Sequence, residues 1–244
     1  MPAVNAQGAE RLIHASEEPP ERIINQPYSF LVSHKKDNWN LLSNLCDKYG
    51  SDKGQIRTEG QPYTWAAHTY TDFYGRLFDH CRQHVVKVFE CGIGSNNKNI
   101  PSNMGVNGKP GASLRVWCDY FPNSTVYAVD IDKDILFQTE RIKTSYLDQT
   151  DPESIREFWN EFDVADFDLM VDDGLHAFHP AITLFENSIS RLSDYGVYVI
   201  EDVSPHDLQL LEQYFSDKDY KVDFVQMYRP HHALENNSLV VVRQ

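Results

Sequence analysis

The stretch from Val85 to Ser95, with the sequence VVKVFECGIGS, constrains the fold more than any other part of the chain. Its β-branched and aromatic residues predict a strand buried on both faces, and the strand ends in an acid and a Gly-x-Gly turn. Gly92 and Gly94 allow the backbone to turn sharply and to approach a ligand closely. Because open α/β sheets bind ligands beyond the carboxyl ends of their strands, we expect a ligand at this turn.

Strands and helices alternate through the rest of the chain. This alternation predicts a Rossmann-like, doubly wound α/β sheet, mostly parallel, to which a C-terminal hairpin adds one antiparallel strand. The predicted strands cover 85–90, 125–130, 141–147, 167–172, 196–202, 222–228 and 238–242. The predicted helices cover 112–121, 134–139, 151–159, 180–192 and 205–215.

Two further segments precede this predicted domain, which we place at residues 83–244. Residues 1–28 contain the run EEPPE and little hydrophobic periodicity, so we expect an arm that is flexible or exchanges between the subunits of a homo-oligomer. Residues 29–82 show helical spacing of apolar residues and predict an N-terminal helical extension. Thr71 is its expected helix N-cap.

Composition narrows the possible partners. A net charge of −14 and a pI of about 5.0 argue against a nucleic-acid partner, which needs clustered Lys and Arg. No apolar run is long enough for a bilayer, and the first ten residues do not predict a signal peptide. The four cysteines form no CxxC pair, so we expect free thiols and a cytoplasmic protein.

Acids near the first turn indicate the kind of ligand. A dinucleotide site favours a third Gly after Gly-x-Gly-x-x, but that position is Asn97, which disfavours a nicotinamide dehydrogenase. Glu90 precedes the turn and Asp130 ends the next predicted strand. Together they suit a cofactor with a cationic amino-acid tail and a ribose but no pyrophosphate. Taken singly, each could also be a solvated strand end.

A second group of acids lies at the ends of the fourth and fifth predicted strands. Asp172, Asp173 and His176 follow the fourth strand, and Glu201 and Asp202 end the fifth. Neighbouring strands lie about 4.8 Å apart, so these acids could share one cation. Oxygen ligands without a thiolate favour Mg²⁺ over Mn²⁺ or Ca²⁺. The alternative is that the acids cap the helices that follow.

Several short motifs, in a shared order and spacing, resemble the class I S-adenosylmethionine-dependent methyltransferases. Within that class, the chain resembles the macrolide-sugar O-methyltransferases that act on mycinamicin and macrocin. The motifs are YGSDK at 49–53, HTYTxxY at 68–74, ECGIG at 90–94, GASLRVW at 111–117, DQ at 148–149, DDGxH at 172–176 and YVIED at 198–202. The chain departs from the family at Leu175, where Ser is common, and in a longer insert between Gly94 and Gly111.

The resemblance implies S-adenosyl-L-methionine and Mg²⁺ as cofactors. It implies Asp173, Glu201 and Asp202 as metal ligands. It also implies His176, as the base, and Asp173 as the catalytic residues. The cofactor-binding residues predicted from motif and position are Tyr49, Ser51, Lys53, His68, Glu90, Gly92, Gly94, Asp130, Asp148, Gln149 and Asp172.

We therefore expect Mg-dependent methyl transfer to a hydroxyl of a sugar-containing small molecule, such as a natural product or a glycan precursor. A cation could lower the pKa of that hydroxyl, and His176 has an ordinary pKa near 6.5 that suits proton transfer. The alternatives are a catechol-type or other small-molecule O-methyltransferase, and an inactive cofactor-binding partner subunit.

Overall fold

The computed structural model describes residues 28–35, 39–56, 62–229 and 235–244. The predicted arm at 1–28 therefore lies, apart from Tyr28, outside the described residues. Within them, no helix combines the length and the apolar character needed to cross a membrane.

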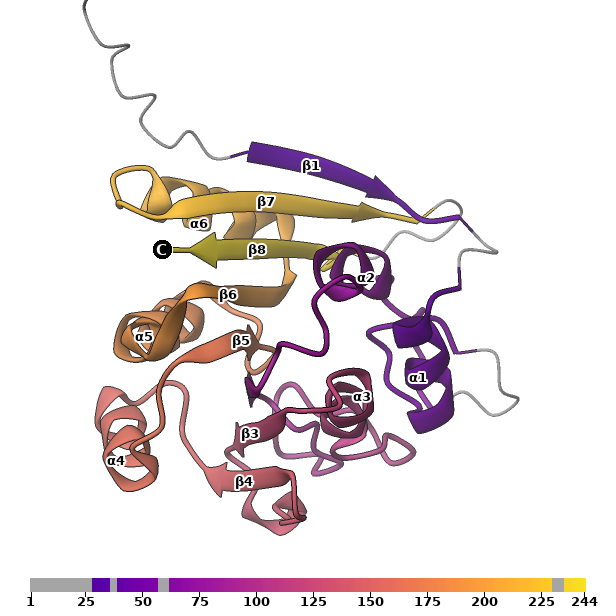
Figure 1. The fold of residues 1–244 in the computed structure, drawn as a ribbon, viewed down its shortest axis with the longest axis horizontal. Helices are drawn as coiled ribbons and strands as arrows, with labels where there is room; N and C mark the ends of the chain where they lie inside the picture. The colour runs from indigo at the N-terminus through magenta and orange to yellow at the C-terminus, as the bar shows by residue number, and fades with distance from the viewer. Residues whose placement is uncertain (1–27, 36–38, 57–61, 230–234) are drawn as a thin grey trace, which may run out of the picture.

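The described residues form an eight-stranded sheet with the strand order β1-β7-β8-β6-β5-β2-β3-β4 (Figure 1). Its strands are β1 Tyr28–Ser33, β2 Lys87–Cys91, β3 Thr125–Asp130, β4 Ile142–Tyr146, β5 Phe167–Asp172, β6 Leu192–Val203, β7 Lys221–Tyr228 and β8 Ser238–Arg243. Every neighbouring pair is parallel except the two that β8 forms with β6 and β7. The predicted Rossmann-like, mostly parallel sheet with an antiparallel hairpin strand is confirmed.

Helices cover both faces of the sheet (Figure 1). On one face lie α1 (Leu41–Tyr49), α2 (Thr71–Phe78) and α3 (Ala112–Tyr120), and on the other lie α4 (Pro152–Phe162), α5 (Phe178–Ser188) and α6 (Pro205–Phe215). Each face has its own apolar cluster, one built around Tyr74 and Trp117 and the other around Phe89, Trp159 and Phe185. The first cluster joins the N-terminal helices α1 and α2 to the sheet.

Helix boundaries decide whether the strand-end acids act as caps. Helix α5 begins at Phe178, two residues before the expected start, and its N-cap Ala177 makes no side-chain cap. Helix α6 is capped by Ser204, whose side chain accepts from the Asp207 amide. Neither Asp173 nor Asp202 therefore caps the helix after it.

Three local expectations were wrong. Thr71 is the first residue of α2 and not its cap, because the N-cap position is Tyr70. The helix expected at 134–139 is a short 3-10 turn, η1 (Lys133–Ile135), and a second such turn, η2 (Ile189–Arg191), follows α5. Strand β1 lies in the segment expected to be helical. Its residues are mostly exposed, and the segment is a strand because it pairs in parallel with β7.

The strand order brings several chain segments together at the carboxyl ends of the central strands. After β2 the chain passes to β3 and β4 on one side, then returns to β5 on the other, so the topology switches between β2 and β5. Cys91 pairs with Asp172, and Asp172 pairs with Ile200. The next residues, Asp173 and Glu201, therefore lie side by side at the carboxyl ends of β5 and β6.

Candidate active site

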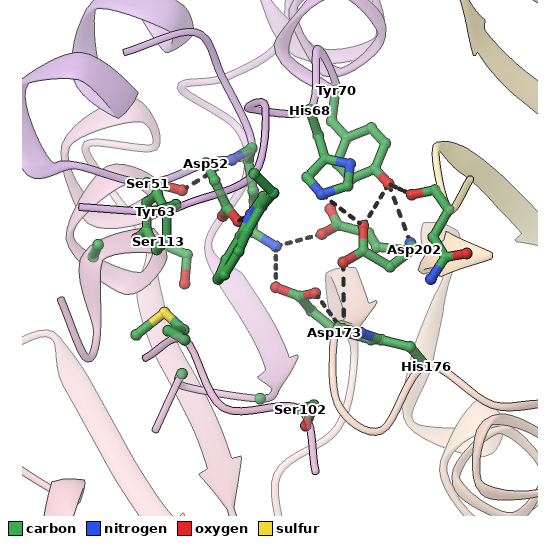
Figure 2. Close-up of a pocket in the computed structure, with 18 of the residues that line it drawn as sticks. Ser51, Asp52, Tyr63, His68, Tyr70, Ser102, Ser113, Asp173, His176 and Asp202 are labelled. Atoms are coloured by element: carbon green, nitrogen blue, oxygen red, sulfur yellow. Dashed lines mark hydrogen bonds and ion pairs between the residues drawn. The ribbon is translucent and has the colours of Figure 1, made fainter. Parts of the chain in front are cut away.

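Two adjoining cavities open at the carboxyl ends of the central strands, with volumes of about 350 Å³ and about 460 Å³. Both fall in the range of small-molecule sites, roughly 300 to 1,000 Å³. The first cavity is lined by Ser51, Lys53 and His68 together with the acids of β5 and β6, and Figure 2 shows much of it. The second is lined by residues that follow β3 and β4. Both share Gly92, Gly94, Ser102 and Asp173.

The Gly-x-Gly turn forms the boundary between the two cavities. Gly92 and Gly94 have φ values of 96° and 86°, in the region that favours glycine. A Cβ atom added to Gly92 would lie 2.0 Å from the backbone carbonyl oxygen of Asp173, and one on Gly94 would lie 2.5 Å from the side chain of Met104. Both positions therefore require glycine, because a side chain at either one would collide with neighbouring protein atoms.

The second cavity has acid and amide groups on its surface. Asp130 accepts hydrogen bonds from the backbone amides of Ile93, at 2.7 Å, and Asp132, at 2.8 Å, so its carboxylate is fixed beside the glycine turn. Asp148 and Gln149 also line this cavity. This places three of the predicted cofactor-binding residues around one space.

Gln149 connects this cavity to Asp172. Its side-chain amide donates to Asp172 Oδ1 at 2.6 Å, while its oxygen accepts from the Leu175 amide at 2.9 Å. Asp172 is buried, and burial raises the pKa of its carboxyl to about 6. Asp172 lines neither large cavity and contacts Gln149, which lines the second, so its predicted role in binding a cofactor stays a prediction.

Lys53 is buried among three strand-end carboxylates. Its Nζ atom lies 2.6 Å from Asp173 Oδ2 and 3.2 Å from Glu90 Oε1, and it also bonds the Glu201 carboxylate. Burial alone would lower the pKa of Lys53, but Asp173, Glu201 and Glu90 hold it well above its ordinary value. Lys53 is therefore a fixed positive charge inside the site.

Glu90 is fully buried and lines neither cavity. Its second oxygen accepts from Trp117 Nε1 at 2.8 Å, and its first lies near Lys53. The sequence placed Glu90 beside the cationic end of a cofactor, but the structure places it behind Lys53. Tyr49 also differs from expectation, since its hydroxyl donates to Asp119 at 2.6 Å, away from both cavities.

Two residues of the N-terminal segment contact Asp202. The Tyr70 hydroxyl donates to Asp202 Oδ1 at 2.6 Å, and His68 Nε2 lies 3.4 Å from the same oxygen. The rings of His68 and Tyr70 stack with their centroids 4.8 Å apart. Figure 2 shows this pair directly above Asp202. The motif that carries both residues therefore contacts the acids of β6 directly.

One oxygen each from Asp173 and Asp202 faces the ring of His176. His176 Nε2 lies 3.2 Å from Asp173 Oδ1 and 3.6 Å from Asp202 Oδ2 (Figure 2). Ligand atoms of these three residues lie within 4.8 Å of one another, a spacing that could hold a metal ion. Burial lowers the pKa of His176, but Asp202 and Asp173 outweigh it and raise that pKa to about 10.

Glu201, expected as a third metal ligand, has a different environment. One of its oxygens accepts from the Tyr74 hydroxyl at 2.6 Å and the other bonds Lys53. Both carboxylate oxygens are therefore engaged by the N-terminal segment, and Glu201 is not part of the group formed by Asp173, His176 and Asp202.

Several lining residues were not predicted from the sequence. Tyr63, Trp65 and Met104 bring apolar surface to the first cavity, and Trp65 donates to the partly buried carboxylate of Asp52 at 2.8 Å. Tyr63 and Trp65 have ring centroids 5.0 Å apart. The sequence feature that could have indicated Tyr63 and Trp65 is the presence of two aromatic residues in an otherwise polar loop. No sequence feature indicated Met104, because it lies in the long insert after Gly94.

No protein-family model matches the chain. Among curated proteins, it is 33% identical over 162 residues to the 8-demethyl-8-alpha-L-rhamnosyl tetracenomycin-C 2'-O-methyltransferase of Streptomyces olivaceus, covering 66% of this chain and 37% of that protein. It is 34% identical over 163 residues to the L-olivosyl-oleandolide 3-O-methyltransferase of Streptomyces antibioticus, covering 66% of this chain and 36% of that protein.

A solved structure gives the same relationship. The MycE methyltransferase of the mycinamycin pathway, in complex with Mg and SAH, superposes with a TM-score of 0.60 at 25% identity, covering 84% of this chain and 55% of that one. The chain has the class I methyltransferase fold. The resemblance to the macrolide-sugar O-methyltransferases is confirmed in sequence and in structure.

The match has a clear limit in length. The aligned part of this methyltransferase-like chain spans little more than a third of the two curated relatives, 37% and 36%. What the longer relatives do as whole proteins is therefore a basis for proposals about this chain.

Proposed function

We propose that the chain transfers a methyl group from S-adenosyl-L-methionine to a hydroxyl of a sugar-bearing small molecule, with Mg²⁺ as the metal. The observation that carries the proposal is the position of the Asp173–His176–Asp202 group beside the glycine turn, where the two cavities meet. Relatives named as sugar O-methyltransferases support it.

The second cavity suits the adenosine part of the cofactor. Asp130 and Asp148 offer carboxylates to ribose and adenine donors, and Gly92 and Gly94 allow close approach of the thioether. The first cavity begins on the other side of the same glycines, where the Ser51 hydroxyl can bind the amino-acid tail. The cofactor would supply an electrophilic methyl group at this boundary.

The residues present also suit a hard divalent cation. Asp173 and Asp202 turn carboxylate oxygens toward one point, and these are the oxygen ligands that Mg²⁺ prefers. Glu201, the third predicted ligand, would join them only by leaving Tyr74 or Lys53. A bound cation would lower the pKa of a coordinated sugar hydroxyl.

His176 is the proposed base because it faces the same point from the loop after β5. Only the neutral ring can accept a proton, and its two carboxylate neighbours now favour the charged form. Neutralisation of Asp173 and Asp202 by a bound cation would remove the cause of the raised pKa of His176. The acceptor would enter through the first cavity, where Trp65 and Tyr63 provide an aromatic surface.

The decisive experiment measures methyl transfer and ligand binding together. S-adenosylhomocysteine should raise the melting temperature and NAD should not, because only a ligand of the native state stabilises it. Rhamnosyl and olivosyl acceptors with Mg²⁺ should give methylated product, and chelator should prevent it. His176→Ala should reduce transfer by roughly 10²- to 10⁴-fold while retaining the thermal shift.

The two alternatives give other results in the same assay. Methylation of catechols but not of sugars would indicate a catechol-type enzyme. A thermal shift without transfer to any acceptor would indicate an inactive cofactor-binding subunit. No shift with S-adenosylhomocysteine would contradict the proposal as a whole.

A further inference from the structure

Lys53 lies where the ends of three neighbouring strands meet. Its ammonium contacts an acid from β2, one that follows β5 and one from β6, namely Glu90, Asp173 and Glu201. Only 3% of the residue is exposed. The chain brings Lys53 here from the loop after α1, so this contact joins the N-terminal helices to the reactive edge of the sheet.

The contacts of Lys53 distinguish two possible roles. Its ammonium could support the acids of the cation site, or it could occupy the place of the cation. Lys53 bonds Oδ2 of Asp173 and leaves Oδ1, which is the oxygen that faces His176. Its contact with Glu201 uses the oxygen that Tyr74 does not. The ammonium therefore lies behind the group formed by Asp173, His176 and Asp202, and does not occupy the point on which their ligand atoms converge.

We propose that Lys53 is a positioning residue of the cation site, holding Asp173 and Glu201 from behind so that Asp173 presents its Oδ1 atom beside Asp202. The inference rests on the proposed function, because it concerns the cation which that function requires. Partners behind metal ligands fix the orientation of those ligands, and their loss weakens metal binding by about 10- to 100-fold. A lysine that competed with the cation would have the opposite effect, since its removal would strengthen binding.

The test is a titration of the full chain with Mn²⁺, followed by electron paramagnetic resonance of the free ion. Lys53→Met should weaken Mn²⁺ binding by about 10- to 100-fold. Lys48→Met is the matched control, because Lys48 is an exposed lysine whose Nζ pairs with Asp119 at 2.8 Å. It removes the same charge away from the site and should leave the affinity unchanged.

Unchanged or tighter binding by Lys53→Met would overturn the inference. If the wild-type chain binds no Mn²⁺ at all, the metal part of the proposed function fails instead. The two failures are thus distinguished by the wild-type titration alone.

A double variant covers the case in which Lys53→Met does not fold, since it leaves buried carboxylates without their cation. Lys53→Met/Glu201→Gln removes one charge of each sign. It should bind Mn²⁺ at least about fivefold more weakly than Glu201→Gln alone, because Asp173 has still lost its support. Equal affinity of these two variants would show that Lys53 positions nothing.

Discussion

At the scale of single residues, the site depends on its glycines as much as on its acids. Gly92 lies against the carbonyl of Asp173, so the glycine turn and the first of the strand-end acids are in direct contact. The backbone amide of Asp173 also donates to the Cys91 carbonyl at 2.9 Å. The conformation of the turn and the position of Asp173 are therefore linked by direct backbone contacts.

We predict that Gly92→Ala weakens S-adenosylhomocysteine binding at least tenfold, an energy of about 1.4 kcal/mol. The new Cβ would lie 2.0 Å from the Asp173 carbonyl oxygen, so the two strand ends must separate. Titration calorimetry measures the affinity. Gly105→Ala is the control, because Gly105 has a similar φ of 72° but no atom within 4 Å of a Cβ.

Both variants carry the conformational strain of alanine at positive φ, roughly 1–2 kcal/mol. Only Gly92→Ala adds the contact with Asp173. Equal affinities for the two variants would mean that close packing of the turn against β5 does not matter for the ligand.

At the scale of elements, much of the fold could be predicted, and the reasons are visible in the chain. Asp151 and Pro152 start α4 as expected, since the Asp151 side chain accepts from the Glu153 amide. The buried strands around Val88 and Leu169 are recognisable by composition. Strand β1 was not, because pairing with β7 and not burial makes it a strand.

The cap of α4 gives a prediction at this scale. Asp151→Ala should reduce the free energy of unfolding by about 1 kcal/mol, because the first turn loses its side-chain acceptor. Urea denaturation measures the change. Glu157→Ala, on the exposed side of the same helix, should alter the free energy by less than about 0.5 kcal/mol. A loss of similar size in both variants would contradict a specific role for the cap.

The candidate site was less predictable than the elements. The positions of Asp173, His176 and Asp202 follow from strand ends that motifs reveal. The engagement of Glu201 by Tyr74 and Lys53 depends on how the N-terminal helices pack against the sheet, which no spacing in the sequence encodes. The same packing explains why Glu90 lies behind Lys53.

At the scale of the whole molecule, the N-terminal helices and the sheet form one unit around the site. Lys53, Tyr70 and Tyr74 each reach from the N-terminal segment to an acid of β5 or β6. Because residues of the N-terminal segment and of the sheet both line the first cavity, a ligand bound there would contact both parts.

We predict that S-adenosylhomocysteine with Mg²⁺ slows hydrogen exchange in two regions. One is the N-terminal region formed by residues 50–56 and 68–74, and the other is residues 92–104. Both line the first cavity, so ligand binding should reduce the local opening that exposes their amides. Exchange mass spectrometry measures this, with β1 as the internal control because it lines neither cavity. Protection confined to 92–104 would show that the helical layer does not respond to the ligand.

The hairpin of β7 and β8 gives the first cavity its remaining side, through Glu235 and Asn236. Tyr63 and Trp65 also line this cavity, and they too come from outside the strands β2 to β5, around which the second cavity lies. Substitutions in these two outlying segments can thus reshape the entrance for an incoming molecule without disturbing the half that surrounds the glycine turn. On the proposed function, this division would allow the choice of acceptor to change while the half that binds the methyl donor stays the same.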